Sequence, residues 1–214
     1  MNAPGATVNA EVTGVILAGG RARRMGGVDK GLIELAGVTL MAHVHDALRG
    51  QVRNVLINAN RNLDRYREFG AEVVTDRRAG YLGPLAGMAA AMHAAATGVI
   101  GTVPCDSPFV PPDLICRLYG ALAASGDDIA VASDGERLQP VFLLAPTRLQ
   151  SDLEAFLDSG ERKIDRWLAR HAVQVVDFSD CPDAFLNINT PAERDAIERR
   201  LLGALAAPTM GTGS

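Results

Sequence analysis

Short apolar runs alternate with amphipathic stretches along most of the chain. An apolar run of about four to eight residues is typical of a buried strand, whereas apolar residues three and four apart indicate a helix. In residues 39–48, for example, Leu40, Val44 and Leu48 fall on one helical face. The pattern predicts strands at 12–17, 52–58, 71–76, 99–103 and 173–178, and helices at 39–48, 63–69, 83–96, 111–124, 148–157 and 164–171.

The order of these elements predicts an α/β fold. Strands that alternate with helices form mostly parallel sheets with right-handed crossovers, and ligands bind beyond the carboxyl ends of such strands. Residues 129–146 break the alternation, because two β-rich runs there are separated only by the polar residues 133–136. This spacing indicates a hairpin or a strand reversal, so we expect a mostly parallel, mixed central sheet.

The length and composition are those of one globular domain. The chain has 214 residues, of which 48% are hydrophobic and 21% charged, so it can bury a sizeable core. A last helix is expected after Thr190, which with Glu193 has the spacing of a capping box. We expect a domain over residues 12–203, a disordered lead-in at 1–11 and a flexible tail at 204–214.

Charge and cysteine content exclude several classes of protein. The formal net charge of −4 argues against nucleic-acid binding, which normally requires a basic surface. The cysteines Cys105, Cys116 and Cys181 form no C-x-x-C pair and are odd in number, so neither a disulfide framework nor a structural zinc site is expected. A reducing cytoplasm fits this pattern, and the first residues lack the features of a secretory signal.

Residues 79–105 contain no charged side chain and have the length of a membrane span. Pro84, His93, Gly98 and Pro104 interrupt this alanine-rich segment, which holds few strongly inserting residues. We therefore expect a buried helix followed by a core strand, and no membrane association.

Glycines and cations are concentrated directly after the first expected strand. Between Leu17 and Lys30 the chain holds Gly19, Gly20, Gly26, Gly27, Arg21, Arg23 and Arg24. Glycines let backbone N–H groups approach a ligand closely, and the cations attract an anion, for which polyphosphate is the natural candidate. Neither G-x-G-x-x-G nor G-x-x-x-x-G-K-[ST] fits these residues, which argues against a dinucleotide-binding site and a P-loop.

The motif LAGG followed by RMGG and DK resembles the signature of the nucleotidyltransferases, the superfamily of sugar-nucleotide pyrophosphorylases. The unbroken LAGGRARRMGGVDKGL is very similar to the MobA family, the molybdenum cofactor guanylyltransferases. Supporting matches lie at residues 76, 83–87, 104–108 and 187–191, and the likeness extends over about residues 12–200.

The resemblance implies a single three-layer, Rossmann-like nucleotidyltransferase domain. It also implies an enzyme that transfers GMP from GTP to the terminal phosphate of molybdenum-molybdopterin and releases pyrophosphate, with Mg²⁺ as cofactor. Proteins for molybdenum insertion and molybdoenzyme maturation are further partners that it suggests. A cytidylyltransferase or a sugar-phosphate nucleotidyltransferase using the same loop remains an alternative, as does a nucleotide-binding module without catalysis.

On the nucleotide side, the resemblance and the residue chemistry assign the phosphates to the glycine-rich loop. The segment Leu17, Ala18, Gly19 and Gly20 would line the phosphate cradle with N–H groups, and Lys30 and Arg24 would neutralise the β- and γ-phosphates. Arg21 and Arg23 contact phosphate or face solvent.

The base and the metal are assigned to polar residues after later strands. Asn58 and Asp76 match positions that contact GTP, and they have oxygens for the guanine N1–H and N2–H₂; a turn after a strand would also explain them. Asp106 matches the magnesium ligand and is expected to be catalytic; the alternative is a helix N-cap.

The acceptor side of the site is less distinctive. Asn187 and Asn189 alternate along an extended segment, so both would face the same side and bind the pterin substrate or metal-bound water. Arg162 and Lys163 are candidates for its terminal phosphate, and a surface turn is the alternative for them.

Overall fold

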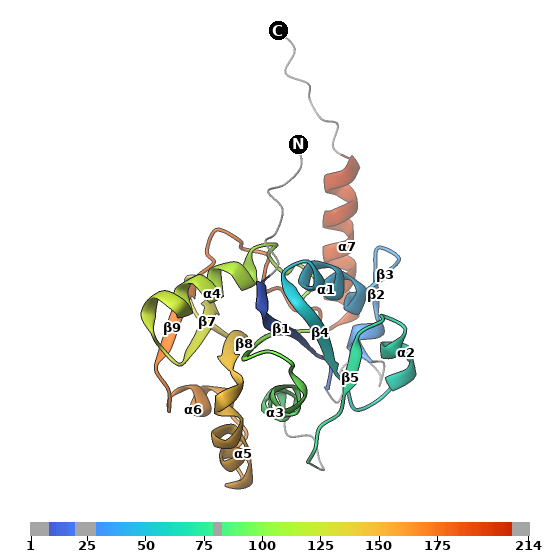
Figure 1. The fold of residues 1–214 in the computed structure, drawn as a ribbon. Helices are drawn as coiled ribbons and strands as arrows, with labels where there is room; N and C mark the ends of the chain where they lie inside the picture. Colours follow the sequence, from blue (N-terminus) through green and yellow to red (C-terminus); the bar gives the residue numbers. More distant parts are fainter. Residues whose placement is uncertain (1–8, 20–28, 79–82, 207–214) are drawn as a thin grey trace.

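The computed structural model describes residues 9–19, 29–78 and 83–206. These residues form a seven-stranded sheet of order β5-β4-β1-β6-β8-β7-β9 and a separate two-stranded ribbon (Figure 1). The strands of the sheet are β1 (Asn9–Leu17), β4 (Val52–Asn58), β5 (Glu72–Val74), β6 (Val99–Pro104), β7 (Ile129–Ser133), β8 (Leu138–Pro146) and β9 (Val173–Asp177), and the ribbon is β2 (Glu34–Leu35) with β3 (Val38–Thr39). The helices are α1 (Leu40–Arg49), α2 (Leu63–Arg67), α3 (Pro84–Ala94), α4 (Leu114–Ser125), α5 (Gln150–Asp158), α6 (Ile164–Leu168) and α7 (Pro191–Ala206), with 3₁₀ turns η2 (Lys30–Leu32) and η3 (Thr147–Leu149).

β1 lies inside the parallel part of the sheet, where it pairs with β4 and with β6. Its last residue, Leu17, is level with Asn58 at the end of β4 and with Pro104 at the end of β6. The carboxyl ends of these three strands therefore meet at one edge of the sheet. β8 runs antiparallel to both β6 and β7, which confirms the mixed sheet and the strand reversal predicted around residues 133–136.

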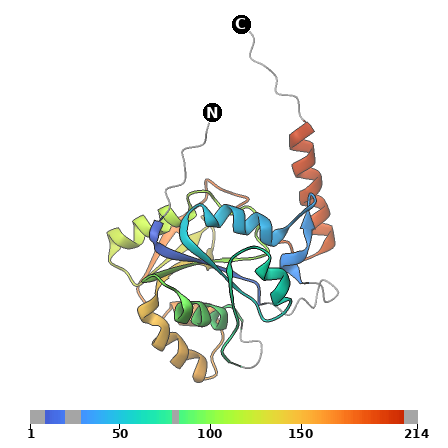
Figure 2. The same cartoon turned by 45° about the vertical axis from the view of Figure 1, so that its right-hand side comes forward.

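Helices cover both faces of the sheet, so the domain has three layers (Figures 1 and 2). On one face α1 and α4 contribute to a core that includes Leu118, and on the other α3, α5 and α6 contribute to a second core that includes Trp167. Successive side chains of a strand point to opposite faces. Accordingly, Ile16 of β1 lies in the first core and Val15 in the second.

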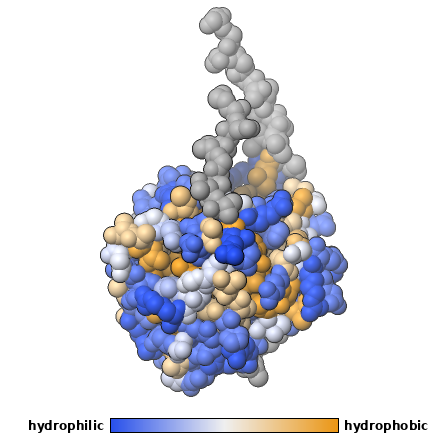
Figure 3. Space-filling view, viewed as in Figure 1, coloured by the Kyte–Doolittle hydropathy of each residue, from blue (hydrophilic) through white to orange (hydrophobic). Residues whose placement is uncertain are grey.

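The charge-free segment of the sequence is explained by burial. The eight residues from Leu85 to Met92 of α3 are all buried, and the strand that follows, β6, is central in the sheet. This confirms the expected buried helix and core strand. Within the described ranges, no helix combines the length and the apolar character needed to cross a membrane. The face of the molecule shown in Figure 3 is largely hydrophilic, with apolar side chains in small groups between polar ones.

Several element boundaries differ from the sequence-based expectation, and three of them have a clear physical reason. β1 begins at Asn9, inside the lead-in expected at 1–11, because Asn9 already pairs with Val52 and donates its N–H to the Gln51 carbonyl. α4 begins at Leu114 instead of residue 111, since consecutive prolines disfavour helical geometry in the residues before them. α7 reaches Ala206, beyond the expected end at 203, in keeping with the high helix propensity of alanine.

Candidate active site

The glycine-rich loop leaves the sheet between two neighbouring strands. The Ala18 N–H donates to the Asn58 carbonyl at 2.8 Å, and the Cys105 N–H donates to the Leu17 carbonyl at 3.1 Å. Leu17, Ala18 and Gly19 are therefore at the edge where the strand ends meet, as predicted. A Cβ on Gly19 would lie 3.3 Å from side-chain atoms of Asn58 and Asn60, so this position is crowded. Gly20, Arg21, Arg23 and Arg24 lie outside the described residues.

Lys30 lies at the centre of a contact between three of the predicted site residues. Its Nζ donates to Asp106 Oδ2 at 2.7 Å and to Asn189 Oδ1 at 2.5 Å. Asp106 follows β6, and Asn189 precedes α7, so the three residues come from distant parts of the chain. The side chains of Lys30 and Asp106 are 26% and 16% exposed, which leaves the pair open to a ligand but mostly out of water.

An extended segment at residues 187–189 lies against the residues that follow β6. The Ile188 N–H donates to the Asp106 carbonyl at 2.9 Å, and its side chain is buried in a small core with Ile33, Leu35 and Leu40. Because Ile188 points into this core, the side chains on either side of it, Asn187 and Asn189, point the other way. Their amide oxygens meet Ser107 and Lys30, respectively. The prediction that the two asparagines share one side is confirmed.

Asn58 and Asp76 also meet, and a residue that we did not predict completes their contact. Asn58 is 2% exposed, and its Nδ2 donates to Asp76 Oδ1 at 2.9 Å. Asn60 Nδ2 donates to Asp76 Oδ2 at 2.8 Å, and the Asp76 N–H donates back to Asn60 Oδ1 at 2.9 Å. The sequence N-A-N at 58–60 contained a signal for Asn60, since residues two apart in an extended chain share a face.

Gly87 explains why α3 can lie so close to this contact. A Cβ at position 87 would be 2.2 Å from Asn58 Oδ1, a distance that no real Cβ tolerates. Glycine at this position is therefore required by the packing of Asn58. The expectation that residues 83–87 bring backbone close to the ribose stays a prediction.

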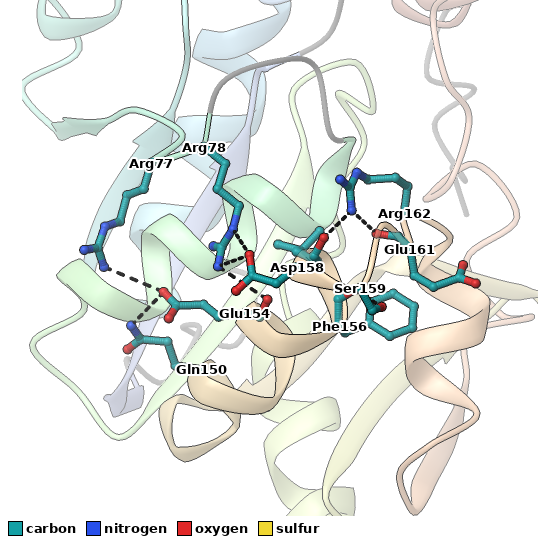
Figure 4. Close-up of polar contacts among 10 residues, drawn as sticks. Arg77, Arg78, Gln150, Glu154, Phe156, Asp158, Ser159, Glu161 and Arg162 are labelled. Carbon is teal, nitrogen blue, oxygen red and sulfur yellow. Dashed lines mark hydrogen bonds and ion pairs between the residues drawn. The ribbon is translucent and has the colours of Figure 1, made fainter.

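The segment after Asp76 is held to α5 by arginines (Figure 4). Arg78 Nε donates to Asp158 Oδ1 at 2.9 Å, and Arg77 Nη1 lies 3.7 Å from Glu154 Oε1. The hydrogen bond from Arg78 lowers the pKa of the Asp158 carboxyl. These contacts link the segment after Asp76 to α5. Residues 79–82, which follow, lie outside the described ranges.

Arg162, a candidate for the acceptor phosphate, contacts backbone carbonyls in the structure, and its phosphate role stays a prediction. Its Nη1 donates to the carbonyls of Leu157 and Glu161 at 2.5 Å each, close to the carboxyl end of α5 (Figure 4). A cation at this end of a helix satisfies carbonyls that have no partner within the helix. Lys163 is exposed and precedes α6.

The residues at this edge of the sheet form a chemically coherent site. The Lys30 ammonium, the Asp106 carboxylate and the Asn189 amide oxygen converge, and a second carboxylate, that of Asp76, is held by two amides shortly after β5. Among the residues that the structure describes, there is no cluster of three or more His, Cys, Asp or Glu side chains that could hold a metal ion by itself. A metal at Asp106 would therefore take its remaining ligands from amide, substrate or water oxygens.

Known proteins resemble this chain in fold and in sequence. Residues 14–175 match the family of MobA-like NTP transferase domains. The molybdenum cofactor guanylyltransferases of Shewanella sediminis and Shewanella loihica are 51% and 50% identical to this chain over 191 residues, covering 89% of it and 97% of each relative. The crystal structure of molybdopterin-guanine dinucleotide biosynthesis protein A from Archaeoglobus fulgidus superimposes with a TM-score of 0.75 at 24% identity, covering 89% of this chain and 99% of that one. The chain therefore belongs to the MobA-like NTP transferase family, among the molybdenum cofactor guanylyltransferases.

Proposed function

We propose that this protein transfers GMP from GTP to the terminal phosphate of molybdenum-molybdopterin, forming the guanine dinucleotide cofactor and releasing pyrophosphate. One observation carries the proposal beyond family membership. Lys30, Asp106 and Asn189 converge within hydrogen-bond distance, and Cys105, next to Asp106, donates its N–H to Leu17 at the end of β1. A nucleotidyltransferase requires this combination of a cation for phosphate and oxygens for a metal at one place.

The donor set at Asp106 fits Mg²⁺. This ion takes oxygen ligands, usually one or two carboxylates completed by substrate phosphates and waters. The Asp106 carboxylate and the Asn189 amide oxygen already enclose one cation, the Lys30 ammonium, at 2.7 and 2.5 Å. We propose Asp106 as the magnesium ligand, with the bound ion supplying positive charge to the phosphates of GTP.

The reaction needs little proton transfer. The acceptor is a phosphate monoester, whose second pKa is about 6, so its oxygen is mostly ionised near neutral pH. This oxygen forms a bond to the α-phosphorus of GTP, while the bond from that phosphorus to the departing pyrophosphate breaks in line with it. Lys30 stabilises the charge that develops on the pyrophosphate. Arg24 is proposed as a second cation for the same charge, and Leu17, Ala18, Gly19 and Gly20 as the phosphate cradle.

We assign the guanine base to Asp76 and Asn58. A carboxylate has about four lone-pair sites. In Asp76 each oxygen accepts one amide N–H, from Asn58 or Asn60. Among the residues that the structure describes, nothing else donates to these two oxygens, so each has one further site, which suits the neighbouring N1–H and N2–H₂ donors of guanine. Cytosine has only one exocyclic amino donor, so the site favours a purine with two donors on adjacent atoms.

We assign the acceptor phosphate and pterin to the side of the site that holds Asn187. The two asparagines differ in their contacts: Asn187 meets Ser107, whereas Asn189 meets the Lys30 ammonium. Asn189 therefore belongs to both halves of the site, and Asn187 is the more specific candidate for the acceptor. We further propose a cytoplasmic location, partner proteins that insert molybdenum and mature molybdoenzymes, and one catalytic domain over residues 12–203.

Pyrophosphate release from GTP in the presence of molybdenum-molybdopterin tests the proposal. The protein should release pyrophosphate only with acceptor, Mg²⁺ and GTP present together. CTP in place of GTP would identify a cytidylyltransferase, and a sugar phosphate in place of molybdopterin would identify a sugar-nucleotide enzyme. GTP binding without release of pyrophosphate under any of these conditions would leave a non-catalytic nucleotide-binding module.

A further inference from the structure

Lys30 is separated along the chain from β1, the strand that precedes the glycine-rich loop. β1 ends at Leu17, and Lys30 begins the short turn η2 before the ribbon of β2 and β3. The backbone position of Lys30 is therefore not set by pairing within the large sheet. The ammonium lies at the end of a flexible side chain, so its contact with Asp106 depends on how residues 29–31 are held.

The residue before Lys30 carries a buried carboxylate. Asp29 is 7% exposed, and it stands at the N-cap position of η2 without capping that turn through its side chain. Its Oδ1 accepts from the Tyr66 hydroxyl at 2.5 Å, and its Oδ2 accepts from Asn62 Nδ2 at 3.0 Å. A buried carboxylate is unfavourable unless it is hydrogen-bonded. These two hydrogen bonds stabilise the Asp29 carboxylate in the interior of the protein.

The residue after Lys30 packs on the same hydroxyl. Tyr66 of α2 is fully buried, and a Cβ added to Gly31 would lie 2.7 Å from its hydroxyl oxygen. The Tyr66 hydroxyl thus contacts both neighbours of Lys30, by a hydrogen bond on one side and by close packing on the other. Burial, with smaller contributions from Cys105 and Asp29, raises the pKa of Tyr66, so the hydroxyl keeps its proton and remains a donor.

We propose that Tyr66 and Asp29 are positioning residues for Lys30. They hold the backbone on both sides of it so that the ammonium reaches Asp106 and, in the complex, the phosphates of GTP. The inference rests on the proposed function in one respect, the contact of Lys30 with phosphate. Nothing in the sequence pattern pointed to Tyr66, because it lies 37 positions from Asp29 on a separate helix.

A double-mutant cycle on GTP affinity tests the inference. Tyr66→Phe removes one hydroxyl and keeps the buried ring, and Lys30→Met removes the ammonium and keeps the chain length. We expect Tyr66→Phe to weaken GTP binding in calorimetry about tenfold, and to have little further effect in the Lys30→Met protein. Affinity for GMP, which lacks the β- and γ-phosphates, should change less than twofold. The matched control is Tyr119→Phe, a partly buried tyrosine whose hydroxyl makes no hydrogen bond within the described residues.

The outcomes separate this inference from the proposed function. If Lys30→Met binds GTP as tightly as the wild type, the phosphate role of Lys30 is wrong, and the positioning role falls with it. If Lys30→Met is weak but Tyr66→Phe equals the wild type, or if the two losses simply add, only the positioning role is overturned. Equal weakening of GTP and GMP by Tyr66→Phe would also overturn it, because that result indicates general damage to the site.

A second cycle tests the close packing of Gly31 on the Tyr66 hydroxyl, and its first variant leaves Tyr66 intact. Gly31→Ala would place a methyl group against the Tyr66 hydroxyl and should weaken GTP binding about tenfold. In the Tyr66→Phe protein the oxygen is gone, so the same substitution should cost less than threefold. A loss from Gly31→Ala that is the same in both backgrounds would contradict the close packing on which the inference depends.

Discussion

Lys30 Nζ and Asp106 Oδ2 lie 2.7 Å apart, so the carboxylate proposed to bind the metal is paired with a cation of the protein itself. Asn189 Oδ1 completes the enclosure of this cation at 2.5 Å. If Asp106 holds Mg²⁺ when GTP binds, as proposed, the ion would compete with the Lys30 ammonium for the same oxygens. Lys30 would then be free to reach the phosphates of GTP.

Removal of the ammonium should make the free protein bind divalent ions more tightly. We expect Lys30→Met to raise the affinity for Mn²⁺ without nucleotide by about tenfold. In the variant the Asp106 carboxylate has lost the neighbouring ammonium that neutralises it, so it attracts a divalent ion more strongly. Electron paramagnetic resonance of free Mn²⁺ measures this directly. Lys163→Met, which removes an exposed lysine, is the control. An unchanged or weaker Mn²⁺ affinity in Lys30→Met would show that the two cations do not compete.

Substitution of Asp106 should abolish transfer and preserve the fold. Asp106→Ala leaves the Lys30 ammonium without this partner, but the Lys30 side chain is 26% exposed, so no deeply buried charge remains. We expect kcat/KM to fall by at least about 1,000-fold, the scale of losing a central electrostatic contact, with Tm lowered by only a few degrees. Mg²⁺-dependent turnover close to that of the wild type, in a protein with an unchanged circular dichroism spectrum, would rule out the metal role of Asp106.

Asp76→Asn should weaken GTP binding and reduce the preference for GTP over ITP, which lacks the 2-amino group. The substitution replaces one acceptor oxygen by an NH₂ group that faces an amide donor of Asn58 or Asn60. It also removes an acceptor for guanine, and an unpaired buried donor costs about 1–3 kcal/mol. Competition calorimetry with the two nucleotides gives the ratio, and Asp64→Asn on the exposed face of α2 is the control. If the GTP-to-ITP ratio stays constant, the base is read elsewhere.

The two asparagines near Asp106 should separate in their effects. Within the described chain the Asn187 side chain hydrogen-bonds only to Ser107, so Asn187→Ala is expected to raise the KM for molybdopterin about tenfold while GTP affinity stays within twofold. Asn189→Ala frees the Lys30 ammonium from one partner and should change both parameters. This revises the sequence-based expectation that the pair acts on the acceptor alone. Similar losses of GTP affinity in the two variants would contradict the division.

Alanine at two helical glycines should have opposite effects on stability. In Gly87→Ala the added Cβ would lie 2.2 Å from Asn58 Oδ1. We therefore expect the free energy of unfolding to fall by about 1–3 kcal/mol and GTP binding to weaken. Gly120 in α4 is exposed and has nothing within 4 Å of an added Cβ, so Gly120→Ala should stabilise the protein by up to about 1 kcal/mol. Urea denaturation measures both. A neutral Gly87→Ala would show that Asn58 is not held against α3.

The elements of the fold were predictable because they depend on local pattern. Helical and strand periodicities, the hairpin residues at 133–136 and the capping pair Thr190 and Glu193 all act over a few positions, and the structure confirms them. The errors fell on element ends. The position of an element end depends on contacts with residues far away in the sequence, which local periodicity does not include. The start of β1, for example, depends on the pairing of Asn9 with Val52.

The sequence by itself determined the residue types of the site and their order along the chain. Strand ends, together with the resemblance to a known family, were sufficient to predict one site for these residues: Lys30, Asn58, Asp76, Asp106, Asn187 and Asn189. Their arrangement was decided by tertiary structure. The level ends of β4, β1 and β6 set which side chains meet, and register between strands far apart in sequence has no local code. For the same reason Asn60 on Asp76, Gly87 against Asn58 and Tyr66 beside Lys30 emerge only from packing, in which a contact depends on two surfaces at once.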